Sequence, residues 1–263
     1  WSAARAAGSS VAVWAAALTV VGCWSLGRQW LVDPWNPYIA VLPMVAMLFL
    51  AWAVIAGDAR ALPVLALAAS FVAQAHVMGA PLAFVMLAGA AAVVVAGRTA
   101  VRELVTTAAV LAISWSFPLW DQLVHRPGNM VALARAYRAD EQEAVGWTYA
   151  ARAVARAIGV VPLFGRPARD VGPLGAPLSI GAWLAVLAVI TVLIGGTVLA
   201  FLRRDRIAAS AGVVALTVLV VGGATTAQVP AGFPDVAFYR VLQLWPLGIF
   251  VWFALGVTAV RMW

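Results

Sequence analysis

Residues 180–202 read IGAWLAVLAVITVLIGGTVLAFL, a stretch without a charged side chain that is followed at once by Arg203-Arg-Asp-Arg206. A helix of about 20 residues crosses the roughly 30 Å hydrocarbon core of a bilayer. The stretch is long enough for that crossing, and arginines suit the boundary with the headgroups. It therefore predicts a membrane-spanning helix that ends at the first arginine.

Seven further apolar runs extend this prediction to the whole chain. Hydrophobic residues make up 65% of the 263, and the mean hydropathy is +0.98. The runs are continuously apolar, whereas the strands of a membrane barrel alternate apolar and polar residues, so we expect helices. The predicted fold is an all-α, polytopic transmembrane helix bundle of about eight spans, forming a single domain over residues 1–263. The expected spans are 9–27, 38–56, 61–78, 80–97, 104–120, 180–202, 207–228 and 242–260.

The arginines predict the orientation of the bundle. All 17 basic residues are arginine and the net charge is +7, but they stand singly or in short groups between apolar runs. That distribution favours a role in membrane topology and argues against a nucleic-acid partner. With the first residues in the cytoplasm, only Arg28 and Arg240 fall in short outer loops, so we expect a multi-pass plasma-membrane protein with its polar loops outside. The short cytoplasmic segments then hold Arg5, Arg60, Arg98, Arg102, Arg203, Arg204, Arg206 and Arg261.

Residues 121–179 form the longest outer segment. Apolar residues at helical spacing after Asn129 and again from Ala144 to Phe164 predict one or two amphipathic helices on the outer membrane surface. Residues 165–177, rich in Gly and Pro, predict a loop. Charged residues of this segment either pair on a solvated face or attract an anionic lipid headgroup. They are Arg135, Arg138, Arg152, Arg156, Asp140, Glu141 and Glu143.

Polar residues concentrate most sharply where the fifth predicted span ends. Asp121, Gln122, His125, Arg126 and Asn129 fall within nine residues of a chain that is 10% charged. Such groups at a membrane edge are costly to place, which makes them a functional-site hypothesis, although a solvated helix end is the plainer interpretation. Asp121 and His125, one helical turn apart, are candidate proton-handling residues, and Arg126 can fork onto phosphate oxygens.

Three further outer segments carry candidate binding residues. Asp33-Pro-Trp-Asn-Pro-Tyr38 is typical of a turn with interfacial aromatic rings, but Asp33 and Asn36 could also bind sugar hydroxyls while Trp35 stacks on a ring. Gln74 and His76 end the third span, where Ser70 and Gln74 share a helical face and could serve only as hydrogen-bonding contacts between helices. Residues 233–240 add Asp235, Tyr239 and Arg240.

Cysteine and histidine usage limits the cofactor chemistry. The single cysteine, Cys23, lies in an apolar run and excludes a disulfide within the chain. Two histidines without a recognisable spacing do not make a zinc site, while a divalent metal held by carboxylates stays open and no cofactor is certain. The chain begins at Trp1 without a secretory signal, and we expect that a longer protein continues upstream.

Several of these motifs together resemble a known family. Trp35-Asn-Pro-Tyr38, Gln74-Ala-His76, Pro118-Leu-Trp-Asp-Gln-Leu123 and Pro127-Gly-Asn129 are similar to the later part of multispanning actinobacterial glycosyltransferases of the GT-C superfamily. The resemblance implies transfer of a sugar from a polyprenyl-phosphate donor to a cell-envelope lipid or glycan acceptor on the outer face of the membrane. Such enzymes carry an acidic catalytic residue in their first outer loop, which we expect upstream of Trp1.

The sequence thus favours a membrane glycosyltransferase with named roles for its outer residues. Asp121 and His125 would be catalytic; the expected substrate-binding residues are Arg126, Asn129, Gln122, Asp33, Trp35, Asn36, Gln74, His76 and Arg240. A transporter or lipid flippase is an alternative, although transporters tend to place polar sites at mid-membrane. A noncatalytic assembly subunit is another, since Gly195-Gly196 and Gly222-Gly223 allow close approach of helices within the chain or with a partner.

Overall fold

The computed structural model describes residues 3, 7–28, 32–97, 100–139, 143–231 and 238–262, without the side chains of 137–139 and 238. Within these residues the chain is all-α, as predicted, with one isolated β-bridge between Ala144 and Pro230 and no strand. Some residues used in the predictions lie outside the described residues: Arg5, Arg98, Asp140, Glu141 and Asp235.

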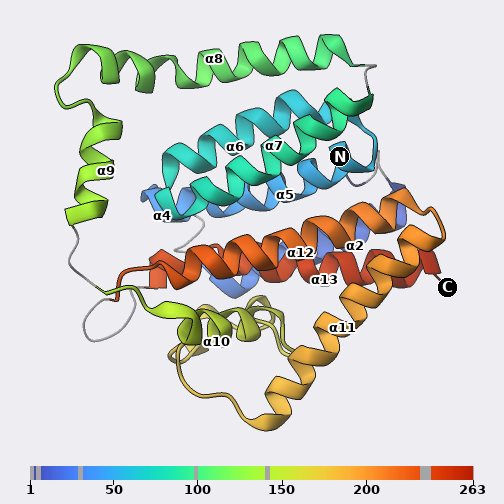
Figure 1. Ribbon diagram of the computed structural model, residues 1–263. Coiled ribbons are helices and arrows are strands. Elements are labelled where there is room, and N and C mark those ends of the chain that lie inside the picture. The colour runs from blue at the N-terminus through green and yellow to red at the C-terminus, as the bar shows by residue number, and fades with distance from the viewer. Residues whose placement is uncertain are drawn as a thin grey trace.

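The apolar runs form long helices that alternate in direction (Figure 1). In the described part of the chain, seven are long and apolar enough to cross a membrane, so this is a polytopic membrane protein. The helices are α2 (Ser9–Leu26), α4 (Asn36–Ile39), α5 (Val41–Ala56), α6 (Leu62–Ala75), α7 (Ala80–Gly97), α8 (Val101–Val124), α9 (Asn129–Ala139), α10 (Gly146–Ile158), α11 (Ile180–Leu202), α12 (Arg206–Ala227) and α13 (Leu244–Met262).

Helix α6 is shorter than the predicted span 61–78. It follows a 3₁₀ turn at Ala59–Ala61, begins with Pro63 in its first turn, and has 14 residues. It ends because His76 takes an extended conformation, with φ −150° and ψ 118°, before a second 3₁₀ turn at Val77–Gly79. The prediction of eight spans therefore becomes seven helices of spanning length and one shorter apolar helix among the described residues.

Helix α8 is longer than the predicted span 104–120, because it continues through Pro118 to Val124. A proline inside a helix leaves the carbonyl four residues earlier without its backbone donor. That carbonyl belongs to Ser114, and it accepts a hydrogen bond from Gln74 Nε2 of α6 at 3.0 Å. Asp121 and Gln122 consequently lie in the last turn of a helix, not at the start of a loop.

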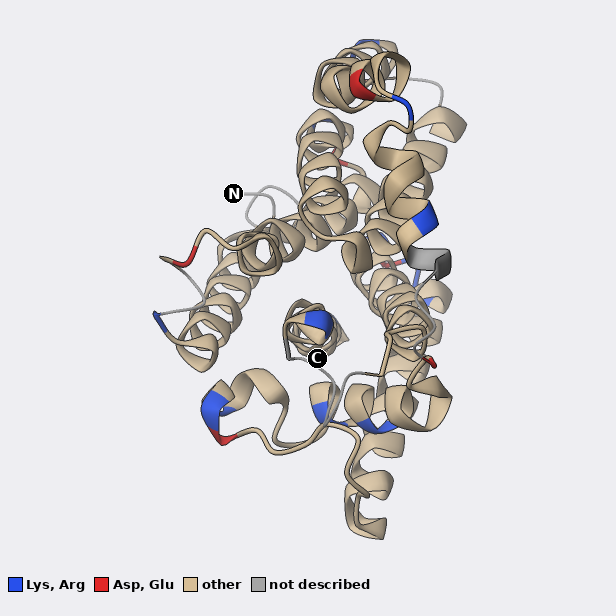
Figure 2. Ribbon diagram, turned by 90° about the vertical axis from the view of Figure 1, so that its left-hand side faces the viewer, with Lys and Arg blue, Asp and Glu red and all other residues tan. Residues whose placement is uncertain are grey.

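Helix α13 occupies the centre of the bundle, and Figure 2 shows the other helices arranged around it. Its aromatic side chains are buried among those of α5: the Phe253 ring lies 4.8 Å from the Phe49 ring and 4.9 Å from the Trp52 ring, both edge to face. Such pairs add roughly 0.5–1.5 kcal/mol each beyond simple burial. The core is therefore built on the contact between α5 and α13.

Two of the four predicted glycines bring helices close together. A Cβ on Gly196 would stand 2.6 Å from Thr258, and one on Gly222 would stand 2.6 Å from Leu247, both on α13. Gly195 and Gly223 have nothing within 4 Å of such a Cβ. Gly196 and Gly222 thus serve packing within the chain, because a Cβ at either position would force the facing side chain of α13 to shift.

The prediction that the apolar face of α10 covers lipid is wrong. Ala153, Ala157 and Ile158 are buried where α10 packs against α12 and α13. The approach is so close that a Cβ on Gly248 of α13 would stand 2.4 Å from the Ala157 carbonyl oxygen. The amphipathic pattern was real, but its apolar face covers protein instead of lipid.

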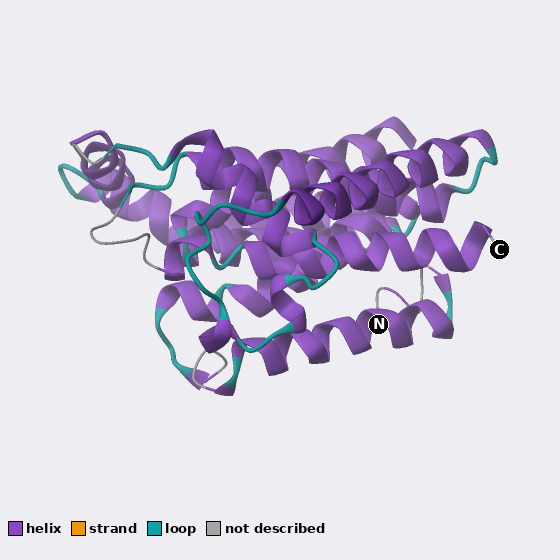
Figure 3. Cartoon of the chain, turned by 90° about the horizontal axis from the view of Figure 1, so that it is seen from below, coloured by secondary structure: helices purple, strands orange, loops and turns teal. Residues whose placement is uncertain are grey.

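The bundle has two chemically different ends. What we call the arginine-rich end comprises the turns 57–60 and 203–206 and the last turn of α13. The outer end comprises α4, the last turns of α6 and α8, α9 and the 3₁₀ turn η5 (Phe238–Val241). Figure 3 shows from below that the helices run between these ends. The predicted outer segments thus gather at one end, and its outward orientation stays a prediction.

Candidate functional site at the outer end

The turn between α8 and α9 joins the residues that the sequence singled out. Asp121 contacts His125 through Oδ1 and Nδ1 at 2.9 Å, and its Oδ2 accepts a hydrogen bond from the Asn129 backbone N–H at 2.7 Å. Gln122 Oε1 accepts one from the Val131 N–H at 3.2 Å. Asp121 and Gln122 therefore hold the first turn of α9 in place, which agrees with the plainer interpretation and leaves their catalytic role a prediction.

This turn, which we call the elbow (residues 121–131), is compact and borders a cationic cavity. A Cβ on Gly128 would stand 2.5 Å from Gln122 Cα, so only glycine fits the turn without a shift of the backbone. On one side of the elbow, a cavity of about 430 Å³ is lined by Gln122, His125, Arg126, Pro127, Gly128, Val131 and Arg135. The cavity combines two guanidinium groups with an imidazole, and the Asp121 and His125 side chains are 37% and 66% exposed.

On its other side, the elbow closes an apolar groove between α6, α7 and α8. A cavity of about 540 Å³ includes Gln74, Trp115, Asn129 and Met130. A second, of about 430 Å³, shares Ala73, Ala80 and Trp115 with it and continues past Phe84 and Leu111. The groove exists because alanines of α6 and α7 face α8 and leave space that larger side chains would fill.

Two polar contacts hold α8 across this groove. Trp115 Nε1 donates to Ser70 Oγ at 3.1 Å, and Gln74 Nε2 donates to the Ser114 carbonyl oxygen. The prediction that Ser70 and Gln74 share a face and bond between helices is confirmed. Gln74 also lines the groove beside Asn129, so it is both a hydrogen-bonding contact between helices and a candidate binding residue.

A second group of predicted residues lies at α4 and η5. The Trp35 ring stands 5.0 Å from the Tyr38 ring and 4.6 Å from the Tyr239 ring. Arg240 lies beside this aromatic cluster: its Nε approaches the Tyr239 hydroxyl at 3.4 Å, and it donates to the Pro230 carbonyl at 2.9 Å.

A local hydrogen bond also shapes the start of α4. Asp33 accepts a hydrogen bond from the Trp35 N–H at 2.9 Å, and Asn36 is exposed. None of Asp33, Trp35, Asn36 and Arg240 lines the groove or the elbow cavity. The predicted site therefore divides into an elbow group and an aromatic group at the same end of the bundle.

His76 belongs to neither group. Its Nε2 is buried and has no hydrogen-bond partner among the described residues. Burial lowers the pKa of His76 below its ordinary value, because the charged imidazolium loses solvation. His76 is therefore neutral at neutral pH.

Sequence reasoning missed the role of Arg152 and Arg156. Instead of pairing with acids, Arg152 donates to the Gly175 carbonyl, and Arg156 donates to the Leu174 and Ala176 carbonyls, at 2.8–2.9 Å. Partial burial lowers the pKa of Arg156, with further contributions from the nearby charges of Arg166 and Arg152. The two arginines fasten the glycine-rich loop to α10; backbone carbonyls carry no signal in the sequence that could have revealed this.

A resident metal has no obvious set of ligands. Over the described residues, no group of three or more His, Cys, Asp or Glu side chains could hold a metal ion. The polar groups at the elbow are suited instead to binding an anion, through guanidinium groups, and to moving a proton, through the Asp121–His125 pair.

The chain was also compared with known proteins. No protein-family model matches it, and neither a curated protein nor a solved structure does.

Proposed function

We propose that this protein is a membrane glycosyltransferase that uses a polyprenyl-phosphate-linked sugar and acts at the outer face of the plasma membrane. The observation that carries the proposal is the elbow, which has an apolar groove on one side and a cationic cavity on the other. A polyprenyl chain suits an apolar groove open to lipid, and a phosphate suits paired guanidinium groups. The two cavities meet at the elbow, where Asn129 and Met130 line the groove and Gly128 and Val131 line the cationic cavity.

In this proposal the elbow binds the leaving phosphate and receives the acceptor proton. The acceptor oxygen forms a bond to the anomeric carbon while the bond from that carbon to the phosphate oxygen breaks. Arg126, with Arg135 beside it, stabilises the departing polyprenyl phosphate. The Asp121–His125 pair takes the acceptor proton, since the carboxylate holds the imidazole by Nδ1 and the other ring nitrogen can face the acceptor.

Amide and aromatic side chains would bind the sugar or acceptor hydroxyls. Gln122 and Gln74 each use one end of the amide inside the protein and keep the other end for a ligand. Asn129 lines the groove, and Trp35 is the exposed member of the aromatic group. Arg240 is a reserve for phosphate binding, because Pro230 and Tyr239 already engage its guanidinium.

Sugar transfer in isolated membranes tests the proposal. With a panel of radiolabelled polyprenyl-phosphate monosaccharides, the change Arg126→Ala should lower transfer on the order of 10- to 100-fold, since a hydrogen bond to a charged group contributes about 1.5–3 kcal/mol. Arg169→Ala is the matched control, because Arg169 is exposed and forms its ion pair with its neighbour Asp170, at 3.7 Å. Full activity of Arg126→Ala, with equal amounts of inserted protein, would remove Arg126 from the site.

A noncatalytic assembly subunit is the second candidate. It is favoured by one observation, that both Asp121 carboxylate oxygens already have partners in the elbow. In that case the chain would bind a lipid phosphate but transfer no sugar from any donor of the panel, and another subunit would accompany it through purification in mild detergent. Sugar transfer by the purified chain alone would exclude this candidate.

A further inference from the structure

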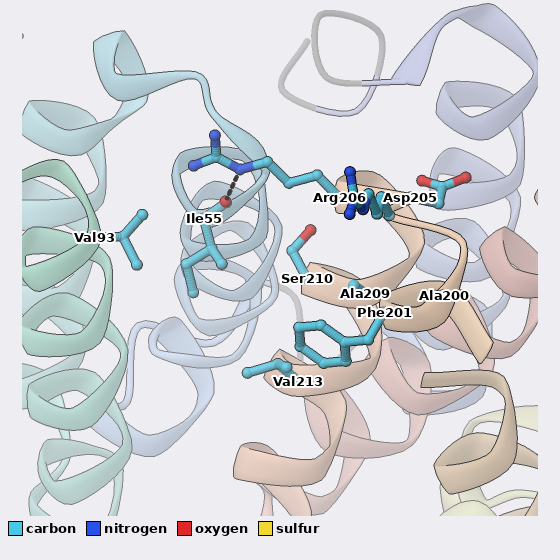
Figure 4. A pocket seen from close by; sticks show the side chains of 10 residues that line it. Ile55, Val93, Ala200, Phe201, Asp205, Arg206, Ala209, Ser210 and Val213 are labelled. Carbon is cyan, nitrogen blue, oxygen red and sulfur yellow. Dashed lines mark hydrogen bonds between the residues drawn. The ribbon is translucent and has the colours of Figure 1, made fainter. Parts of the chain in front are cut away.

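A second cavity lies at the arginine-rich end, far along the bundle from the elbow. It has a volume of about 420 Å³ and lies between α5, α7 and the α11–α12 turn (Figure 4). Its walls are apolar, formed by Ile55, Val93, Phe201 and Val213 among others. Arg204, Asp205 and Arg206 line the same cavity and give it a charged mouth.

The acid at this mouth is already engaged. Asp205 caps α12 by accepting hydrogen bonds from the Ile207 and Ala208 N–H groups, and it pairs with Arg261 at 2.5 Å. Partial burial alone would raise the pKa of Asp205, but these hydrogen bonds and the Arg261 charge hold it below its ordinary value. Asp205 thus balances Arg261 and not the two arginines beside it.

The two remaining arginines have donors to spare. Arg206 Nε donates to the Ile55 carbonyl at 3.1 Å, which places the guanidinium over the end of α5 (Figure 4). This bond uses only Nε, so the two terminal nitrogens can donate to a ligand. Arg204 is exposed, and within the described residues its side chain has no hydrogen bond or ion pair, while its backbone N–H donates to the Phe201 carbonyl. Two positive charges therefore face the mouth of an apolar cavity, beside an Asp205 carboxylate that is already paired with Arg261.

We propose that this cavity binds one anionic glycerophospholipid, with its phosphodiester between Arg204 and Arg206 and an acyl chain against Phe201 and Val213. Anionic headgroups are enriched in the cytoplasmic leaflet and bind basic pockets between spanning helices. The apolar walls select a lipid over a free anion, because inorganic phosphate would gain nothing from them. The site is independent of sugar transfer, since it shares no residue with the elbow.

Thermal unfolding of the full chain in a neutral detergent tests this proposal. A ligand that binds only the folded state raises the unfolding temperature. Phosphatidylglycerol should stabilise the wild type, and phosphatidylcholine should not. Arg204→Gln should weaken the apparent affinity for phosphatidylglycerol about tenfold, the effect of losing one charge-assisted contact. Arg60→Gln is the matched control, because it removes the same charge from the same end but outside the cavity.

Each outcome decides for or against the lipid site. Arg206→Gln should weaken binding as well, and if that variant does not fold, Arg204→Gln decides alone, since the Arg204 side chain makes no hydrogen bond or ion pair within the described residues that its loss would break. Equal stabilisation of Arg204→Gln and wild type would overturn the proposal. So would equal stabilisation by phosphatidylcholine, or stabilisation of the wild type by inorganic phosphate alone.

Discussion

Helices α13 and α8 are built from similarly apolar sequences but are held in opposite ways. In the apolar window of α13, 83% of the residues are buried inside the protein, whereas in α8 the share is 6%. Helix α13 is fixed by side-chain packing on all sides. Helix α8 contacts mainly α6 and α9, and two side-chain hydrogen bonds join it to α6, one donated by Gln74 and one donated by Trp115.

The difference shows how this fold separates stability from function. A helix packed on all sides tolerates little change, while a helix held at a few points leaves a groove that a lipid can enter. The candidate site lies along α8 and at its end, where packing is sparse. Hydropathy alone does not reveal which helix is sparsely packed, because both helices have the length and hydropathy of membrane spans.

The largest difference in stability is expected between the alanine variants of two tryptophans. Trp245 of α13 is fully buried and donates from Nε1 to Ser25 Oγ at 3.0 Å, whereas Trp120 of α8 is 64% exposed. Trp245→Ala should destabilise the protein by about 3–5 kcal/mol, the cost of an emptied core site. Thermal unfolding of the purified variant in detergent measures this loss.

Trp120→Ala is the control and should unfold near the wild-type temperature, because its ring contacts little protein. Equal losses for the two variants would mean that α8 packs as tightly as α13, and the proposed separation of packing from function would be wrong.

The sequence predicted the spans well and the connections between them poorly. The charge-free run 180–202 coincides with α11, because length and hydropathy alone determine a spanning helix. The third run was predicted too long, since nothing in its apolar character marks the extended conformation of His76. Helix α10 was placed on the membrane because an amphipathic pattern does not reveal whether lipid or protein covers its apolar face.

The candidate site shows the same limit at the level of single residues. The contact between Asp121 and His125 was predictable from their spacing of one turn, given a helix that continues. The bond from the Asn129 N–H to Asp121 was not, because it depends on the path of the turn through Gly128. The division into an elbow group and an aromatic group required coordinates, since both groups lie in outer segments of the chain.

Removing one of the hydrogen bonds that hold α8 should have a smaller effect, on the distance between α6 and α8. Gln74→Leu removes the donor to the Ser114 carbonyl, which Pro118 has left without a backbone partner. Such bonds in membranes contribute about 0.6 kcal/mol on average and up to roughly 1.7. The distance between spin labels at Leu67 and Ile113, both exposed, should therefore broaden in a Cys23→Ser background.

Thr106→Val is the matched control for this change. Thr106 Oγ1 bonds only to the Arg102 carbonyl in its own helix, so its loss should leave the α6–α8 distance unchanged. An unchanged distribution in Gln74→Leu would show that packing and not this hydrogen bond fixes α8.

The smallest effect is expected in the pH dependence of stability, through the half-buried His76. Because burial lowers the pKa of His76 in the folded state, the unfolded chain binds more protons between that lowered value and about 6.5. Stability should therefore fall as the pH decreases through this window, and it should be fully present above it. The replacement His76→Gln should flatten the dependence of the unfolding temperature between pH 7.5 and 5.5. A slope that survives in His76→Gln would assign the titration to another group and remove the buried imidazole as its cause.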